Sequence, residues 1–484
     1  MRKILILLSI ILLLFSGCVQ DGRQKSSAPE YKIVGGGGPY KEAILSIQPQ
    51  ALDREIIRYG KGGMTFDIGL TPDQSRAYVA NQVDGNITII SLDENRILDR
   101  FPAEKGVRVV KITPDGKTAY IAGNKKSYAY SAEPPYTLIK EIGAGGNTIA
   151  ITPDGKLAFI TGMMRKDLDV VDTQANKVEK TIELPLTDGK IGIISMVVTP
   201  DGRELWAADA LSGDMYVIDV ATLTVKETIA TEEGDPNLLQ DFMASKKSFM
   251  QIVASPDGKQ VYAGGFSGNV RVFDTERYVE LEPISVNLEP KSDSVNKING
   301  LAIDPQGTTL FVSVINKNAI AVVSIETGKV LYQYGGVNAA RLYSISAREK
   351  DGVNIEFEPS DKKGIPSGVD EADWKRARAF GFISDSDGKY LIEVSALGLR
   401  PNSVYTIWWR GRFGSGPLGG APENGFITDG GGYGKATILI PRDALNDMDE
   451  FVILFHADNR TYGANPGKMG ETSFWHMVGK VPAL

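Results

Sequence analysis

The 484-residue sequence is poor in the residues that most often bind metals and redox groups. It contains one cysteine, Cys18, and two histidines, His456 and His476, so residues 1–455 contain no histidine. This scarcity excludes a CxxCH haem motif, a His/Cys zinc cluster and a Ser-His-Asp triad from that stretch. Only carboxylates, amides, hydroxyls, lysine and arginine remain there for chemistry, and we expect no cofactor.

The overall charge is also low, with a formal net charge of -7. A mildly acidic chain lacks the basic surface that nucleic-acid binding requires, so we expect no nucleic-acid partner. Charged residues make up 23% of the sequence and hydrophobic residues 42%, which is typical of globular domains. The length favours at least two domains.

Residues 1–17 are typical of a lipoprotein signal peptide. Two basic residues precede an apolar run at 4–15, which is too short to span a bilayer comfortably. Small residues then precede Cys18, although Phe15 stands where leucine is usual. We expect an exported protein that is anchored to a membrane by a lipid on Cys18, at the cell surface or in the periplasm. A plain secretory signal or an uncleaved anchor are the alternatives, and residues 18–40 are predicted to be a flexible tether.

A turn of the type Thr-Pro-Asp-Gly recurs along the middle of the chain. Its proline appears six times, at Pro72, Pro114, Pro153, Pro200, Pro256 and Pro305. Proline fixes φ at the first turn position, aspartate caps the turn, and glycine supplies a positive φ. Strand-like runs flank each turn and two more follow, so each repeat predicts four short strands. Such a unit is one blade of a β-propeller.

Two segments carry a resemblance to a known repeat. AYVANQVDGNITIISL (77–92) and LWAADALSGDMYVIDVATLTV (205–225) resemble the YVTN family of propeller repeats. The resemblance covers roughly residues 41–358 and implies the propeller fold, which lactonase-like and surface-protein propellers share. It implies little about function, because the repeated positions belong to turns and core.

The two ends of this region predict a seventh blade. Residues 40–57 align with a third and a fourth strand, and residues 340–359 offer two strands around Asp351. The sequence therefore predicts an all-β chain with a seven-bladed propeller at 41–359, whose ring is closed by N- and C-terminal strands. Six blades with a loose N-terminal hairpin is the alternative.

The remaining chain predicts a second domain. Residues 360–377 are polar and are predicted to be a linker, with room for one helical turn. Strand-like runs in residues 378–484 predict a small antiparallel β-sandwich. His456, Asp458 and His476 are weak candidates for a metal site in it, although ordinary strand histidines are the favoured interpretation.

Candidate binding residues lie where the repeat is irregular. The residue six positions before each turn proline begins the innermost strand and faces the channel of a propeller. The polar members of this ring are our ligand-binding candidates: Arg108, Asn147, Asn299 and, at the seventh position, Arg341. Three long loops would lie on the same face, at 185–194, 231–249 and 285–298. The regularly repeated Asp172, Asp219 and Asp274 are interpreted as structural caps.

No catalytic residue emerges from these patterns, so a non-catalytic propeller scaffold is the favoured function. It would bind a ligand or a protein, such as another envelope protein. A lactonase-like or other propeller hydrolase that uses carboxylate and arginine groups is one alternative. A ligand-sensing or solute-binding lipoprotein is the other.

Cys18→Ser tests the lipid anchor, because it removes the only thiol that could carry the acyl chains. We expect the wild-type protein to partition into membranes and the variant to be released from them, measured by membrane fractionation and detergent-phase partitioning. Full retention of the Cys18→Ser protein in membranes would exclude the lipid anchor.

Overall fold

The computed structural model describes the chain from Tyr31 to Pro482 with several gaps. The described residues are 31–36, 43–58, 67–163, 165–185, 192–209, 213–230, 249–286, 288, 296–346, 352–461 and 463–482. The predicted signal peptide, Cys18 and the greater part of each of the three long loops lie outside these residues. Within them, no helix has the length and apolar character needed to cross a membrane.

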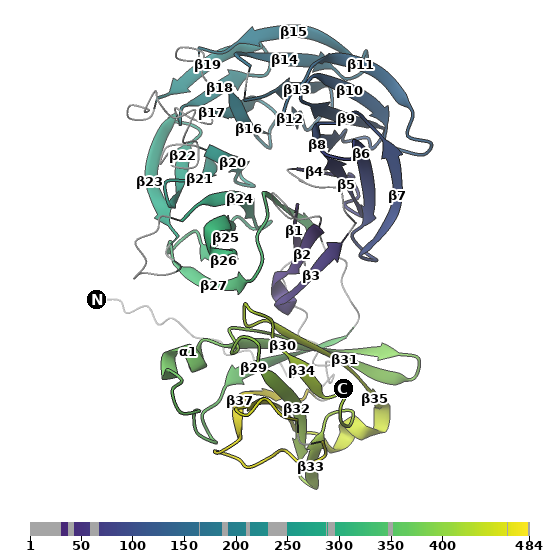
Figure 1. Cartoon of the computed structure of the whole chain (residues 1–484). Helices are drawn as coiled ribbons and strands as arrows, with labels where there is room; N and C mark the ends of the chain where they lie inside the picture. The colour runs from purple at the N-terminus through teal and green to yellow at the C-terminus, as the bar shows by residue number, and fades with distance from the viewer. Residues whose placement is uncertain are drawn as a thin grey trace, which may run out of the picture.

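Seven four-stranded antiparallel sheets form a ring, which confirms the predicted seven-bladed propeller (Figure 1). Six blades consist of consecutive strands. From the channel outward these are β4 (Ile68–Leu70), β5 (Arg76–Asn81), β6 (Asn86–Ser91) and β7 (Arg96–Pro102); β8 (Val107–Ile112), β9 (Thr118–Gly123), β10 (Lys126–Ser131) and β11 (Leu138–Ala144); β12 (Thr148–Ile151), β13 (Leu157–Thr161), β14 (Asp167–Asp172) and β15 (Lys177–Glu183); β16 (Ile193–Val198), β17 (Glu204–Asp209), β18 (Met215–Asp219) and β19 (Thr224–Ile229); β20 (Phe249–Ala254), β21 (Gln260–Gly265), β22 (Asn269–Asp274) and β23 (Val279–Ser285); and β24 (Ile298–Ile303), β25 (Thr309–Val314), β26 (Ala319–Ser324) and β27 (Val330–Gly335).

The recurring turn joins the first two strands of a blade through local hydrogen bonds. In the second of these turns the Thr113 hydroxyl donates to Asp115 Oδ1 at 2.6 Å, and the same oxygen accepts the Lys117 N–H at 3.0 Å. Gly116 has a φ of 74°. It also faces Pro72, the turn proline of the preceding blade. The repeated residues therefore fix each hairpin and also pack neighbouring turns against each other.

The blades are held together by apolar layers between them. One cluster contains Phe159 and Val170 of one blade together with Ile193 and Tyr216 of the next. The second strand of a blade is buried on both faces, as in β17, where all six residues are buried. Burial of this kind on both faces explains why these strands consist of small, aliphatic and aromatic residues.

The closing blade takes strands from both ends of the propeller sequence. Its order from the channel outward is β28 (Arg341–Ser346), β1 (Tyr31–Gly36), β2 (Ala43–Gln48) and β3 (Asp53–Arg58), with the short 3-10 helix η1 (Pro49–Ala51) between the last two. Closure by N- and C-terminal strands is confirmed, and β2 and β3 are the predicted third and fourth strands.

The second strand of this blade differs from the prediction. It is β1, which lies inside the predicted tether and pairs along its length with both β28 and β2. The predicted candidate, β29 (Val353–Pro359), belongs to the other domain. In β29 the buried Ile355 and Phe357 alternate with exposed charged residues, and such a strand cannot occupy a position that is buried on both faces. The propeller therefore spans 31–346 within the described chain.

The C-terminal domain is one nine-stranded antiparallel sheet that curls around a main apolar core. It is sandwich-like, as predicted, and lies below the closing blade in Figure 1. The order of its main path is β33-β32-β36-β37-β29-β30-β31-β35, and β34 pairs with β32. The remaining bounds are α1 (Glu371–Lys375), β30 (Arg378–Ser386), β31 (Lys389–Leu397), β32 (Val404–Gly411), β33 (Gly414–Pro417), β34 (Gly425–Ile427), β35 (Gly434–Pro441), η5 (Arg442–Asp447), β36 (Glu450–His456) and β37 (Ser473–Lys480).

The predicted linker at 360–377 is part of this domain. Asp370 caps the N-terminus of α1 by accepting the N–H of Ala372 at 2.8 Å. Trp374 of the same helix is buried in the domain core and donates its indole N–H to the Ser360 carbonyl at 2.8 Å. The linker prediction was wrong because one buried tryptophan ties an otherwise polar segment to the core.

Polar contacts join the two domains at the outermost strand of the closing blade. Asp53 accepts hydrogen bonds from the Tyr433 hydroxyl at 2.6 Å and from Lys435 at 2.7 Å. Arg54 forms an ion pair with Asp429. Strand β3 is thus held by its own blade and by the C-terminal sheet.

Replacement of Gly35 tests the closing blade. A Cβ at this position would collide with the Arg341 carbonyl in β28, so Gly35→Ala should force β1 and β28 apart. We expect a loss of about 3 kcal/mol in the free energy of unfolding, measured by chemical denaturation. Gly430→Ala is the control, because a Cβ there meets no atom within 4 Å. Equal stability of the two variants would show that β1 and β28 are not tightly packed.

Candidate binding site in the propeller channel

The predicted ring of channel residues lies at the start of the inner strands. In four blades the ring residue is the extra residue of a β-bulge, where the pairing register shifts by one; these are Arg108, Ile194, Met250 and Asn299. Asn147 immediately precedes β12, and its Oδ1 accepts the Met163 N–H at 2.8 Å. Arg341 opens β28 at the seventh position.

Arg341 crosses the channel and binds backbone oxygens of two other blades. Its guanidinium donates to the Ile194 carbonyl at 2.8 Å and to the Met250 carbonyl. The residue is 9% exposed, and burial lowers the pKa of its guanidinium, although Asp67 opposes that shift. Ile194 and Met250, two residues of the ring, therefore accept hydrogen bonds from a third, Arg341. These bonds connect β28 to β16 and β20.

Gln251 of β20, which was not among the residues predicted from the sequence, also binds β28. Its Oε1 accepts the N–H groups of Leu301 and Leu342, both at 2.9 Å, and its Nε2 donates to the Leu342 carbonyl at 2.8 Å. The side chain is buried and uses both ends of its amide. It joins β20 to β24 and to β28.

A third set of polar contacts joins β28 to the blade of β4 and the blade of β8, through Tyr343, Asp67 and Lys111. Lys111 donates to the Tyr343 hydroxyl at 2.6 Å, to Asp67 Oδ1 at 3.1 Å and to the Ile68 carbonyl at 3.1 Å. The Tyr343 hydroxyl in turn donates to Asp67. A Cβ at residue 69 would lie 2.8 Å from the Val110 carbonyl oxygen, so Gly69 permits this close approach of β4 to β8.

The electrostatics of this group favour a closed network. Burial lowers the pKa of the Lys111 ammonium, and the neighbouring Asp67 opposes that shift. Burial, together with Asp67, raises the pKa of the Tyr343 hydroxyl, which therefore remains a neutral hydrogen-bond donor. One carboxylate, one amine and one phenol satisfy one another here, and the Tyr343 hydroxyl connects this group to β28.

A cavity of about 370 Å³ opens at the turn end of the channel. Tyr343 and Ser344 of β28 line it, with Gln74, Asp304 and apolar residues of β20 and β24. The Ser344 hydroxyl is buried and has no hydrogen-bond partner among the described residues. The volume of this cavity is sufficient for a small ligand.

The remaining ring candidates stay separate from this network. Arg108 is half-buried, and burial lowers the pKa of its guanidinium. Asn299 is 5% exposed, and its Oδ1 has no hydrogen-bond partner within the described chain. Ligand binding at Arg108, Asn147, Asn299 and Arg341 stays a prediction.

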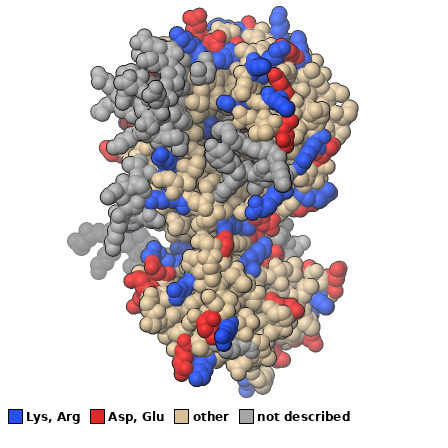
Figure 2. Space-filling model, in the orientation of Figure 1, with Lys and Arg blue, Asp and Glu red and all other residues tan. Residues whose placement is uncertain are grey.

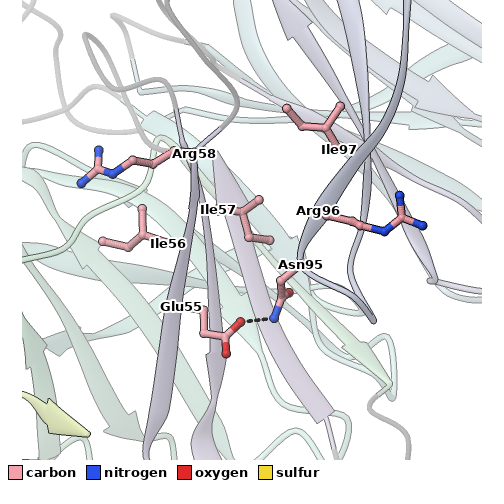
Figure 3. A pocket seen from close by; sticks show the side chains of 7 residues that line it. All are labelled: Glu55, Ile56, Ile57, Arg58, Asn95, Arg96 and Ile97. Carbon is pink, nitrogen blue, oxygen red and sulfur yellow. Dashed lines mark hydrogen bonds between the residues drawn. The ribbon is translucent and has the colours of Figure 1, made fainter.

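A second, larger hollow of about 510 Å³ lies outside the ring, between β3 and β7. Figure 3 shows its seven lining residues. Glu55 and Ile57 point across it toward Asn95 and Ile97, while Ile56 and Arg58 lie on the other side of β3. Asn95 donates to the Glu55 carboxylate across the base of this hollow.

The repeated aspartates have the structural role that was predicted for them. Asp172 accepts the Ala175 N–H at 2.8 Å, and Asp219 accepts the Thr222 N–H at 2.7 Å. Asp274 accepts the Arg277 N–H at 2.8 Å. Each carboxylate caps the turn between the third and fourth strands of its blade.

The two histidines are buried at separate positions in the C-terminal domain. His456 bonds the Thr406 hydroxyl at 2.7 Å. His476 stacks on Trp374, with ring centroids 3.7 Å apart. Asp458 is exposed and accepts the Arg460 N–H. In the described part of the chain, no three His, Cys, Asp or Glu side chains are grouped as a metal site would require, and the weak metal candidates are not brought together.

Sequence comparison adds no family to this description. No protein-family model matches the chain, and no curated protein matches it. Among solved structures, hydrazine synthase from Kuenenia stuttgartiensis is similar, with a TM-score of 0.46 and 20% identity over 64% of this chain and 81% of that one. A similarity this distant carries no activity to this protein.

The buried His476 predicts a pH dependence of stability. Burial lowers the pKa of His476 from 6.5 to about 4. Below pH 6.5 the unfolded chain therefore binds a proton that the folded chain does not, and stability falls as the pH falls toward 4. The shift corresponds to about 3 kcal/mol. Tryptophan fluorescence during denaturation at several pH values measures it.

His476→Gln is the matched variant, because it keeps hydrogen-bonding groups but does not titrate. We expect its unfolding free energy to depend less on pH between 6.5 and 4 than that of the wild type. Parallel curves for the two proteins would show that His476 has the same pKa in the folded and the unfolded chain, and would contradict the shift caused by burial.

Proposed function

We propose that the protein is a non-catalytic, lipid-anchored scaffold of the cell envelope, which binds another envelope protein or a surface ligand. The observation that carries the proposal is the use of the channel side chains. Arg341, Gln251 and Lys111 are bonded to backbone groups and to the Tyr343–Asp67 pair around β28. Groups that hold the ring closed are poorly placed to act on a substrate.

A rigid ring suits a protein whose work is done at its surface. The apolar layers between blades and the contacts of Asp53 with Tyr433 and Lys435 give one scaffold with two surfaces of different shape. Acidic and basic side chains are interspersed over the visible face of both domains (Figure 2). Binding sites commonly develop on loops and edges of such scaffolds.

The two alternatives, a hydrolase and a ligand-sensing protein, require different features of the channel. A hydrolase would need a carboxylate that can activate water, and Asp67 is engaged by Lys111 and Tyr343. A ligand-sensing protein would need a cavity. The hollow of about 370 Å³ at the turn end of the channel favours that as the second candidate.

Hydrolysis assays distinguish the scaffold from the hydrolase. We expect the purified full chain to give no turnover of lactones, aryl esters or phosphate esters above the uncatalysed rate, and Asp67→Asn to give the same result. Turnover by the wild type that is lost in Asp67→Asn would overturn the non-catalytic proposal.

Cross-linking in intact membranes tests binding. Discrete cross-linked species that require Cys18 are expected from the wild-type protein, whereas Cys18→Ser should lose them. If both proteins remain uncross-linked while abundant in the envelope, the scaffold proposal fails.

A further inference from the structure

Strand β3 presents an unpaired edge beside the hollow in Figure 3. In the order β28-β1-β2-β3 it is the last strand, so one of its edges has no partner within its sheet. The Tyr433 hydroxyl contacts both the N–H and the C=O of Arg54, at 3.5 and 3.4 Å. The backbone groups of Arg54 therefore point away from β2.

Alternation along the strand extends this result to Ile56 and Arg58. In an antiparallel pair, every second residue turns its N–H and C=O away from the partner strand. Because Arg54 is such a residue, the backbone groups of Ile56 and Arg58 also point outward. The C-terminal domain covers the edge at Arg54 through Tyr433, and the hollow begins beyond this contact.

The side chains at the edge define an occupant of mixed character. Ile57 and Ile97 face each other across the hollow, and Ile56, which is 45% exposed, lies on the other side of β3 (Figure 3). Ile57 is 5% exposed and belongs to the apolar layer between the two blades, so the aliphatic side chain that an added strand meets is Ile56. Arg58 is exposed and has no ion-pair partner among the described residues.

A second polar group in the hollow lacks a partner. Asn95 donates its amide to Glu55, while its carbonyl oxygen is buried and accepts no hydrogen bond in the part of the chain that is described. A buried amide oxygen without a donor costs free energy.

We infer that this edge binds an extended segment of a partner protein, which adds to β3 as a fifth strand. An aliphatic residue of the segment contacts the exposed Ile56, and a carboxylate beyond it pairs with Arg58 on the same face of β3. The inference rests on the proposed scaffold function and assigns it a place, the junction of the closing blade, the next blade and the C-terminal domain.

Two synthetic probes test the inference on the full chain by fluorescence polarisation. The first is a fluorescein-labelled, C-terminally amidated Val-Ile-Val-Glu-Glu peptide, and the second is its Val-Ile-Val-Lys-Lys counterpart. We expect the acidic peptide to bind about tenfold more tightly than the basic one, and this preference to shrink in high salt.

Variants of β3 locate the binding. Ile56→Pro removes an outward N–H without removing a bond to β2, and Arg58→Glu reverses the charge; each should weaken acidic-peptide binding about tenfold. Lys177→Glu makes the same charge change on the exposed start of another outer strand and should leave binding unchanged. Thermal unfolding verifies that all three variants remain folded.

Three outcomes would overturn the inference: no binding of the acidic peptide, equal binding of both peptides, or unchanged binding in Ile56→Pro and Arg58→Glu. The membrane cross-linking experiment stays separate from these outcomes. Cross-linked partners that persist in Ile56→Pro would leave the scaffold function standing and place its site elsewhere.

Discussion

The whole ring depends on how β28 is held at its centre. This strand is the only one of the closing blade that comes from the C-terminal side of the propeller, and it has no covalent neighbour among the other three. Backbone pairing with β1 holds one edge of it. Arg341, Gln251 and the Lys111–Tyr343–Asp67 group hold it from within the channel.

These polar contacts explain why buried charges are tolerated in the channel. A buried charge or amide is costly unless its hydrogen-bonding groups are satisfied. The Gln251 amide uses both of its ends, and the Arg341 guanidinium binds carbonyls that the β-bulges at Ile194 and Met250 present to the channel. The bulges thus re-aim carbonyls toward the arginine that closes the ring.

Local repeat chemistry was sufficient to predict most of the fold. The Pro-Asp-Gly turns and the strands around them repeat closely, so six blades and the shared seventh could be read directly. The glycines of β1 concealed its strand, because Gly35 and its neighbours also suit a tether. The glutamates of β29 were visible and could have excluded it from a doubly buried position.

The candidate site was predicted less completely for a physical reason. The bulge residues share one register, which counting from the turn prolines locates. Arg341 was the nearest candidate for the seventh position, where the sequence has no turn proline. Gln251 and Lys111 act across blades. Gln251 binds backbone groups and Lys111 binds mainly the side chains of Asp67 and Tyr343, and no sequence pattern marks these partners. The sequence did contain one indication of the role of Gln251, because it is a polar residue inside the otherwise apolar inner strand β20. The open edge of β3 could not be predicted either, because its exposure depends on where Tyr433 of the distant C-terminal sheet contacts it.

Arg341, Gln251 and Lys111 are thus committed to holding the ring. The most direct measurement of this view is native-state hydrogen exchange of the Leu342 amide, which donates to Gln251. If the network holds the ring closed, this amide exchanges only through global unfolding in the wild type, and through a lower-energy local opening in Gln251→Leu. Rapid local exchange of Leu342 in the wild type would show instead that β28 opens freely and that the channel network does not hold the ring.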